Sequence, residues 1–245
     1  MSFPPWLPAQ AEDWPGVART IDLTLLTAEA GSAQVRRLCG QALMLGTAAV
    51  CVNGAHVATA ARQLHGSRIR VAATVGFPLG AATSAVKRAE ARIAVEDGAT
   101  ELDMVMAIGM AKSGEWAAVE EDIAGVVEAA RGHAVKVILE TGALTREEVL
   151  RACQACRVAG ARFVKTSTGF HSAGGATAEA VALLREAVGL GMGVKASGGI
   201  RTCEQIVAML KAGADRIGTS SVEGLSGCLG QEAPRLGALL AGEAT

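Results

Sequence analysis

The sequence has no tyrosine and few other aromatic residues. Phe, Trp and Tyr together make up 3% of its 245 residues, whereas half of the residues are hydrophobic. This composition argues against a groove that stacks nucleic-acid bases on aromatic side chains. It also argues against disorder, because the chain can bury a large core built from Ala, Val, Leu and Ile.

Neither sign of charge is in excess in this sequence. The 23 basic and 24 acidic side chains leave a formal net charge of −1, so a polyanionic partner such as nucleic acid is not expected. Six scattered cysteines do not form the dense framework of a small secreted domain, and we expect them to be reduced thiols. The N-terminal residues MSFPPWLPAQ resemble an extended tail and lack the positive segment of a signal peptide. These features predict a cytoplasmic protein.

One stretch without charged residues, 38–61, is long enough to span a bilayer. Gly46-Thr47 and Asn53-Gly54 interrupt this stretch, and the apolar run between them has the length of a strand. We therefore expect the end of a helix, a strand and the start of another helix, and no membrane partner.

Strand-like apolar runs alternate with helical segments from about residue 21 to the C-terminus. The expected strands are 19–25, 48–52, 70–75, 101–107, 135–140, 163–167, 193–196 and 216–219. Between them we expect helices that include 84–97, 115–130, 145–159 and 177–190, the third beginning with a Thr145-x-x-Glu148 capping box. Short, continuous apolar strands indicate a parallel sheet covered by helices on both faces. The alternation predicts an α/β protein, a single (β/α)₈ TIM barrel.

We predict one barrel domain over residues 17–245, preceded by an N-terminal extension over residues 1–16. An open doubly wound sheet is the alternative, but such sheets usually carry a Gly-rich phosphate loop after the first strand. Here Asp22-Leu23-Thr24 occupies that position, and the paired glycines come late, at Gly198-Gly199. A barrel typically holds a phosphate after its last two strands, which favours the barrel.

Lysine is scarce, and half of it lies in apolar strands. The chain has 17 Arg but six Lys, and Lys136, Lys165 and Lys195 sit between apolar residues of the expected strands five, six and seven. Burial or a nearby cation can lower the pKa of lysine until it is neutral, whereas arginine stays charged. The three strand lysines therefore favour amine chemistry over simple pairing of each with a carboxylate inside the barrel.

Three carboxylates in equally apolar settings are candidate partners for these lysines: Asp22, Asp103 and Glu140. Buried carboxylates are rare unless they are paired or functional. If alternation along its strand points Asp103 inward, its carboxylate can approach the lysines of strands six and seven. Glu101, at the start of the same strand, is expected to be solvated.

Two glycine-containing turns follow the expected strands seven and eight. Gly198 and Gly199 have no Cβ, so backbone N–H groups there can approach an anion closely. Gly218, followed by Ser220 and Ser221, leads into a helix whose free N–H groups and dipole favour a phosphate. Together the two turns predict a phosphate site.

Several segments together match a known family. They include Ile21-Asp22-Leu23-Thr24-Leu25-Leu26, Gly76-Phe77-Pro78-Leu79-Gly80 and 136–141, and the most specific are Phe163-Val164-Lys165-Thr166-Ser167-Thr168-Gly169-Phe170, 194–201 and 216–221. In this order they resemble the deoxyribose-phosphate aldolases of the class I, Schiff-base type, over nearly the whole chain.

The resemblance implies a barrel enzyme that reversibly cleaves 2-deoxy-D-ribose 5-phosphate into D-glyceraldehyde 3-phosphate and acetaldehyde, with no metal or other cofactor. It implies Lys165 as the Schiff-base lysine, Asp103 as the acid and base that transfers protons, and Lys195 as its partner. The residues implied to bind the phosphate are Gly169, Gly198, Gly199, Gly218, Ser220 and Ser221, and those implied to support the site are Asp22, Thr24 and Lys136. The partners are then sugar-phosphate and aldehyde substrates, and a homodimer is a candidate assembly.

Two features depart from the family pattern. Some members end in a Tyr that assists proton transfer, and this chain has no Tyr. Phe170 stands where some members carry a Lys after the Thr-Gly pair, which leaves phosphate binding to backbone amides and Arg201.

Two other functions are alternatives. Another Schiff-base aldolase or transaldolase, specific for a different sugar phosphate, would share the barrel and the lysine. A phosphate-binding barrel without catalysis would need the glycine turns but not titratable amines at Lys165 and Lys195.

Some cysteine and histidine residues are further candidates for functional groups. Cys153-x-x-Cys156 falls within an expected helix and lacks a second Cys pair that would complete a zinc site. Cys51, at the end of the expected second strand, is expected to be a small buried hydrophobic residue and not a reactive thiol. His171 is expected to be a loop residue.

Overall fold

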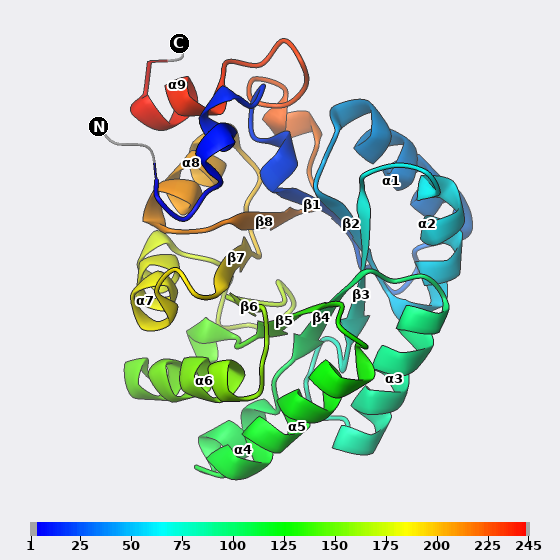
Figure 1. The fold of residues 1–245 in the computed structure, drawn as a ribbon, viewed down its shortest axis with the longest axis vertical. Helices are drawn as coiled ribbons and strands as arrows, with labels where there is room; N and C mark the ends of the chain where they lie inside the picture. The colour runs from blue at the N-terminus through cyan, green and yellow to red at the C-terminus, as the bar shows by residue number, and fades with distance from the viewer. Residues whose placement is uncertain (1–3, 244–245) are drawn as a thin grey trace.

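Eight parallel strands form a closed barrel in a computed structural model, which describes residues 4–243 (Figure 1). Each strand pairs with the next in the chain, and the last pairs with the first. The strands are β1 (Ile21–Leu25), β2 (Ala49–Val52), β3 (Arg70–Val75), β4 (Glu101–Val105), β5 (Ala134–Ile138), β6 (Phe163–Lys165), β7 (Gly193–Ser197) and β8 (Arg216–Thr219). The predicted TIM barrel is confirmed.

Helices surround the barrel and cover its outer face (Figure 1). They are α1 (Ser32–Leu45), α2 (Val57–Leu64), α3 (Ser84–Glu96), α4 (Ile108–Lys112), α5 (Trp116–Ala129), α6 (Arg146–Val158), α7 (Ala178–Val188), α8 (Cys203–Ala212) and α9 (Leu236–Ala241). Short 3₁₀ helices are η1 (Ala9–Asp13), η2 (Ala18–Thr20), η3 (Gly54–His56), η4 (Thr141–Ala143) and η5 (Glu223–Leu225). The strands expected over 101–107, 135–140 and 163–167 end two residues earlier than predicted, because the chain turns there into loops at the mouth of the barrel.

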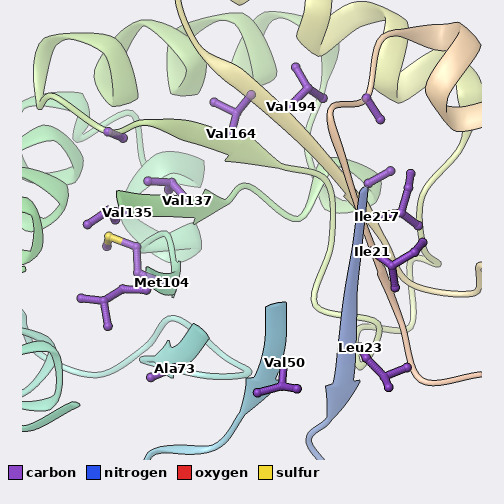
Figure 2. Close-up of a cluster of buried hydrophobic side chains, with 14 of the residues drawn as sticks. Ile21, Leu23, Val50, Ala73, Met104, Val135, Val137, Val164, Val194 and Ile217 are labelled. Carbon is purple, nitrogen blue, oxygen red and sulfur yellow. The ribbon is translucent and has the colours of Figure 1, made fainter. Parts of the chain in front are cut away.

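Most of the apolar core lies between the strands and the helices. Successive side chains of a strand point to opposite faces of the sheet. One face of each strand supplies core residues such as Ile21, Leu23, Val137, Val164 and Val194, all buried (Figure 2). The other face points to the barrel axis, where charged side chains lie beside a few buried apolar residues such as Cys51, Ala72 and Ile138.

The N-terminal segment packs against the C-terminal end of the chain. In Figure 1 it runs in blue beside α8 and α9, and Pro15 forms an isolated bridge with Arg235. Leu7 and Ala11 are buried, so the part of the expected tail from Pro4 onward is folded against the barrel. The domain boundary at residue 17 stays a prediction.

One pair of cysteines corrects the expectation of reduced thiols. Cys203, at the start of α8, forms a disulfide with Cys228, which follows η5. The two are 25 residues apart in the sequence, and nothing in their local patterns indicates that the barrel brings them together. Cys39, Cys51, Cys153 and Cys156 are free and buried.

The charge-free stretch 38–61 folds as the end of α1, then β2, η3 and the start of α2, as predicted. Among residues 4–243, no helix has both the length and the apolar character needed to cross a membrane.

The capping box predicted at the start of α6 is present and provides a test of local stability. The Thr145 hydroxyl accepts a hydrogen bond from the Glu148 N–H, and the Glu148 carboxylate accepts one from the Thr145 N–H. We expect Thr145→Ala to lower the free energy of unfolding by about 1 kcal/mol, because it leaves an N–H of the first turn without its partner. Thr145→Ser keeps the hydroxyl and is the control. Denaturant unfolding of both variants measures the effect, and equal midpoints would contradict the assigned cap.

Candidate active site

Asp103 is the centre of an ion-pair network inside the barrel. Its Oδ1 lies 2.7 Å from Lys136 Nζ, and its Oδ2 lies 2.7 Å from both Lys165 Nζ and Lys195 Nζ. The strand register explains this arrangement, because Asp103 on β4 pairs with Lys136 on β5, and Lys165 on β6 pairs with Lys195 on β7. The predicted meeting of Asp103 with the strand lysines is confirmed.

A second row of charges lies next to this centre. Asp22 on β1 accepts hydrogen bonds from Lys195 Nζ at 2.5 Å and from Arg216 Nε at 2.9 Å. Glu101 Oε2 lies 2.7 Å from Lys136 Nζ and 3.1 Å from Arg216. The expectation that Glu101 is solvated is wrong, since the residue is 3% exposed. Its side chain points to the barrel axis, where Lys136 and Arg216 pair with it.

Cations outnumber carboxylates in this buried network. It contains Lys136, Lys165, Lys195 and Arg216 against Asp22, Glu101 and Asp103. Each of the other three cations contacts two carboxylates at hydrogen-bond distance, whereas Lys165 contacts one. Burial of an unbalanced charge is costly. Loss of one proton balances the network, and Lys165 is the cation with the fewest partners.

The direction of the pKa shifts agrees with this charge count. Burial lowers the pKa of Lys165 below its ordinary value, and the neighbouring Lys195 ammonium lowers it further, against the opposing effect of Asp103. Burial also disfavours the Lys195 ammonium, but Asp103 and Asp22 together raise its pKa. Burial alone would raise the pKa of Asp103, yet the three lysines hold it well below its usual range. Burial and the network together thus lower the pKa of Lys165, raise that of Lys195 and lower that of Asp103.

A cavity of about 200 Å³ opens at the carboxyl ends of the strands, above this network. Its lining consists of Thr24, Leu25, Leu26, Thr27, Lys165, Thr168, Gly169, Phe170, Ser197, Gly198, Gly199, Ile200, Arg201, Gly218, Thr219 and Ser220. Of the three network lysines, Lys165 alone lines this cavity. The amine with the lowered pKa is thus the one that a small molecule can reach.

Glycines from two loops form a cradle on one side of the cavity. Gly169 and Gly198 have positive φ angles of 82° and 94°, and a Cβ on Gly198 would lie 2.9 Å from the Cα of Gly175. A Cβ on Gly175 would lie 2.1 Å from the carbonyl oxygen of Gly198. These positions require glycine for close backbone approach. No sequence signal pointed to Gly175, because its role depends on a contact with another loop.

The cradle presents backbone donors to the cavity. Within the described residues, the N–H groups of Gly169, Gly198, Gly199 and Ser220 donate no hydrogen bond. Ser221 differs, because its N–H donates to the Thr219 hydroxyl and its side chain is outside the cavity lining. Such a concave set of free N–H groups suits an anion.

Glu140 does not join the lysines, contrary to its suggested role as their partner. It follows β5 with a positive φ of 60°, and its buried carboxylate accepts hydrogen bonds from the N–H and hydroxyl groups of Thr168. Its position at the end of a strand was visible in the sequence, but the direction of its side chain was not.

Other tempting residues have ordinary surroundings. Cys51 is buried with its Sγ 4.0 Å from Asp103 Oδ2, and burial raises the pKa of its thiol. Burial likewise raises the pKa of Cys153 to about 12. His171 lies in an exposed loop, where its Nδ1 accepts a hydrogen bond from the Ala173 N–H. Over residues 4–243, no group of three or more His, Cys, Asp or Glu side chains is placed to hold a metal ion.

The chain is a closed β/α barrel, and a buried lysine of lowered pKa lies at its mouth. This combination is typical of barrel lyases that act through an amine. A family model described as "DeoC/LacD family aldolase" matches residues 17–229. The chain belongs to the DeoC/LacD family of aldolases.

Relatives of known name cover most of the chain. A deoxyribose-phosphate aldolase from Geobacillus sp. (strain WCH70) is 53% identical over 206 residues, which is 84% of this chain and 92% of the relative. One from Streptococcus sanguinis (strain SK36) is 53% identical over 213 residues, 87% of this chain and 96% of the relative. The structure of the tetrameric deoxyribose phosphate aldolase from Aeropyrum pernix superimposes with a TM-score of 0.78 at 35% identity, and covers 87% of this chain and 94% of that one.

The lowered pKa of Lys165 can be tested through its reactivity. Labelling of Lys165 by acetic anhydride, followed by peptide mass mapping, should increase with pH and level off below the ordinary lysine pKa of 10.5, because the neutral amine forms at lower pH. In Lys195→Met the midpoint should move to higher pH, since the variant removes a cation and leaves Asp103 to Lys165. The exposed Lys112 serves as an internal reference for the reagent. A midpoint at or above 10.5 in the unmodified protein would contradict the assignment.

Proposed function

We propose that this chain acts as a deoxyribose-phosphate aldolase through an imine on Lys165. The reaction is the reversible cleavage of 2-deoxy-D-ribose 5-phosphate into D-glyceraldehyde 3-phosphate and acetaldehyde. One observation supports this most directly: Lys165, the least paired cation of the buried network, whose pKa burial lowers, is also the network lysine that lines the cavity. The names of the relatives supply the substrate, and the geometry supplies residues for phosphate binding and for imine formation.

Binding begins at the phosphate. The free N–H groups of Gly169, Gly198, Gly199 and Ser220 are the proposed donors to its oxygens, because backbone N–H groups in a concave loop bind anions. Arg201 also lines the cavity and can supply charge. Gly218 contributes by its small size, since a Cβ there would lie 2.9 Å from the Cβ of Ser197. Ser221 orders the turn through its bond to Thr219.

The neutral Lys165 then attacks the aldehyde carbon of the open-chain sugar. The nitrogen loses a proton, the carbonyl oxygen gains protons, and water leaves to give an iminium. Asp103 Oδ2 lies 2.7 Å from both Lys165 Nζ and Lys195 Nζ, so it can pass protons between the two amines and the departing oxygen. Proton transfer by a group already in position contributes roughly 10² to 10⁴-fold to a rate.

The iminium makes carbon–carbon cleavage feasible. The bond between C2 and C3 breaks as a base removes the proton of the C3 hydroxyl. The electron pair moves to the nitrogen side and forms an enamine, and D-glyceraldehyde 3-phosphate departs. Protonation of the enamine carbon and addition of water then release acetaldehyde and the free Lys165. Covalent catalysis replaces one difficult step by several easier ones.

The supporting residues set the charges and positions of these groups. Asp22 and Lys136 pair with Lys195 and Asp103 respectively, which fixes the proton-transferring groups. Thr24 lines the cavity, and its hydroxyl donates to the Asp22 carbonyl oxygen at 3.0 Å. A cytoplasmic location and a homodimer stay predictions.

A coupled assay tests the reaction itself. Deoxyribose 5-phosphate should yield glyceraldehyde 3-phosphate, measured by its enzymatic oxidation, and the rate should be unchanged by EDTA because an iminium replaces a metal ion as the electron acceptor. In the synthetic direction, acetaldehyde should serve as the donor. Activity with dihydroxyacetone in its place would indicate the alternative aldolase or transaldolase, and loss of activity with EDTA would contradict the imine route.

Lys165→Arg tests the nucleophile. The variant should fold with lower stability, because the permanent charge of arginine leaves one cation of the buried network unbalanced. It should lose activity by several orders of magnitude, because arginine stays protonated and forms no imine. With acetaldehyde and borohydride, Lys165 of the unmodified protein should gain an ethyl group in place of one hydrogen, a net addition of C2H4, and the variant should gain none at this position. Lys211→Arg, on the outer helix α8, is the matched control. Near-normal turnover in Lys165→Arg would refute the assignment.

A further inference from the structure

Glu140 adopts a backbone conformation that its residue type disfavours. Its φ and ψ angles of 60° and 59° are left-handed, although it is neither glycine nor asparagine, and the residue is 1% exposed. Such strain is tolerated where the surrounding structure requires it, and it tends to occur at functional sites. A buried glutamate in a strained conformation therefore calls for a structural explanation.

The contacts of Glu140 give that reason. In the described part of the chain, its carboxylate meets Thr168 and no Lys or Arg: Oε2 accepts from the Thr168 hydroxyl at 2.6 Å, and both oxygens are within 3.3 Å of the Thr168 N–H. The same hydroxyl accepts a hydrogen bond from the Phe170 N–H at 3.1 Å. Glu140 and Thr168 thus engage the amides on both sides of Gly169.

The remaining amide of this turn is that of Gly169. Gly169 lines the cavity with its N–H free, and its Cα approaches the Gly198 loop. On either side of Glu140, the Leu139 N–H donates to the Lys165 carbonyl and the Thr141 N–H to the Thr166 carbonyl, both at 2.9 Å. Glu140 is therefore fixed relative to β6 and in turn fixes the loop that follows it.

Glu140 itself does not line the cavity, which separates it from the catalytic groups. We propose that Glu140 is a positioning residue that holds the turn Thr168–Gly169–Phe170 so that the Gly169 amide meets the substrate phosphate. It thereby determines the preference for phosphorylated over unphosphorylated substrate. This inference rests on the proposed function.

The test compares two substrates that differ in the phosphate alone. In Glu140→Ala, KM for deoxyribose 5-phosphate should rise by about tenfold or more, because a displaced loop weakens binding steeply. The value of kcat/KM for unphosphorylated deoxyribose, and the borohydride trapping of acetaldehyde on Lys165, should change by less than about threefold. In Glu140→Gln the rise in KM should be smaller than in Glu140→Ala, since an amide oxygen still accepts from Thr168.

Two further variants keep the test decisive. If Glu140→Ala fails to fold, Thr168→Val removes the hydroxyl that donates to Glu140 and accepts from the Phe170 N–H, with little change in shape, and it should show the same selective rise in KM. Glu147→Gln, an exposed glutamate on α6, should behave like the unmodified protein. An equal loss for both substrates, or no change in KM, would overturn the inference. Absence of trapping in the unmodified protein would instead signal failure of the proposed function.

Discussion

The balance of buried charge inside the barrel is the constraint on which the site depends. Four cations and three carboxylates share a space that solvent hardly enters, and each uncompensated charge there is costly. The excess positive charge disappears if one of the cations loses a proton. A lysine can do so, but an arginine cannot. Lys165 occupies the position with the fewest carboxylate partners. Loss of its proton would therefore balance the buried charge and also make the amine nucleophilic. Asp103 ties the two together, because one of its oxygens contacts both Lys165 and Lys195.

The apolar core outside the barrel stabilises the fold despite this charged interior. The outer faces of the strands and the inner faces of the helices hold most of the apolar core, part of which Figure 2 shows, so most apolar packing lies away from the barrel axis. The strand alternation that sends Leu102 and Met104 outward sends Glu101 and Asp103 inward. A one-residue slip of β4 would exchange these sets, burying charge in the core and removing the Glu101 and Asp103 carboxylates that pair with Lys136 and Lys165. Register and catalysis are thus coupled.

The sequence was sufficient for features that repeat locally and weak for those that depend on distant contacts. All eight strands and the α6 capping box follow from periodicity and spacing, and the scarcity of lysine singled out Lys136, Lys165 and Lys195. Glu101 was misjudged because a charged residue at a strand start is ordinarily solvated, and its burial follows from Lys136 and Arg216 on other strands. The roles of Glu140 and Gly175 and the Cys203–Cys228 disulfide depend on loops that only the closed barrel brings together.

The aldehyde end of the proposed substrate requires a neutral amine at Lys165, whereas the phosphate end favours nearby positive charge. A phosphate dianion close to Lys165 would favour the ammonium and raise its pKa, which works against the neutral amine. In the proposed mode of binding, backbone amides at Gly169, Gly198 and Gly199 would solvate the anion, and these neutral donors cannot exchange partners with Asp103 or Asp22 as a lysine could. Phe170, packed edge-on against Phe77 with ring centroids 5.2 Å apart, places an uncharged side chain next to Gly169, and among the described residues that line the cavity Arg201 is the one charged residue besides Lys165. The carbon chain between the aldehyde and the phosphate then separates the two demands, so the length of the substrate itself helps to keep Lys165 reactive.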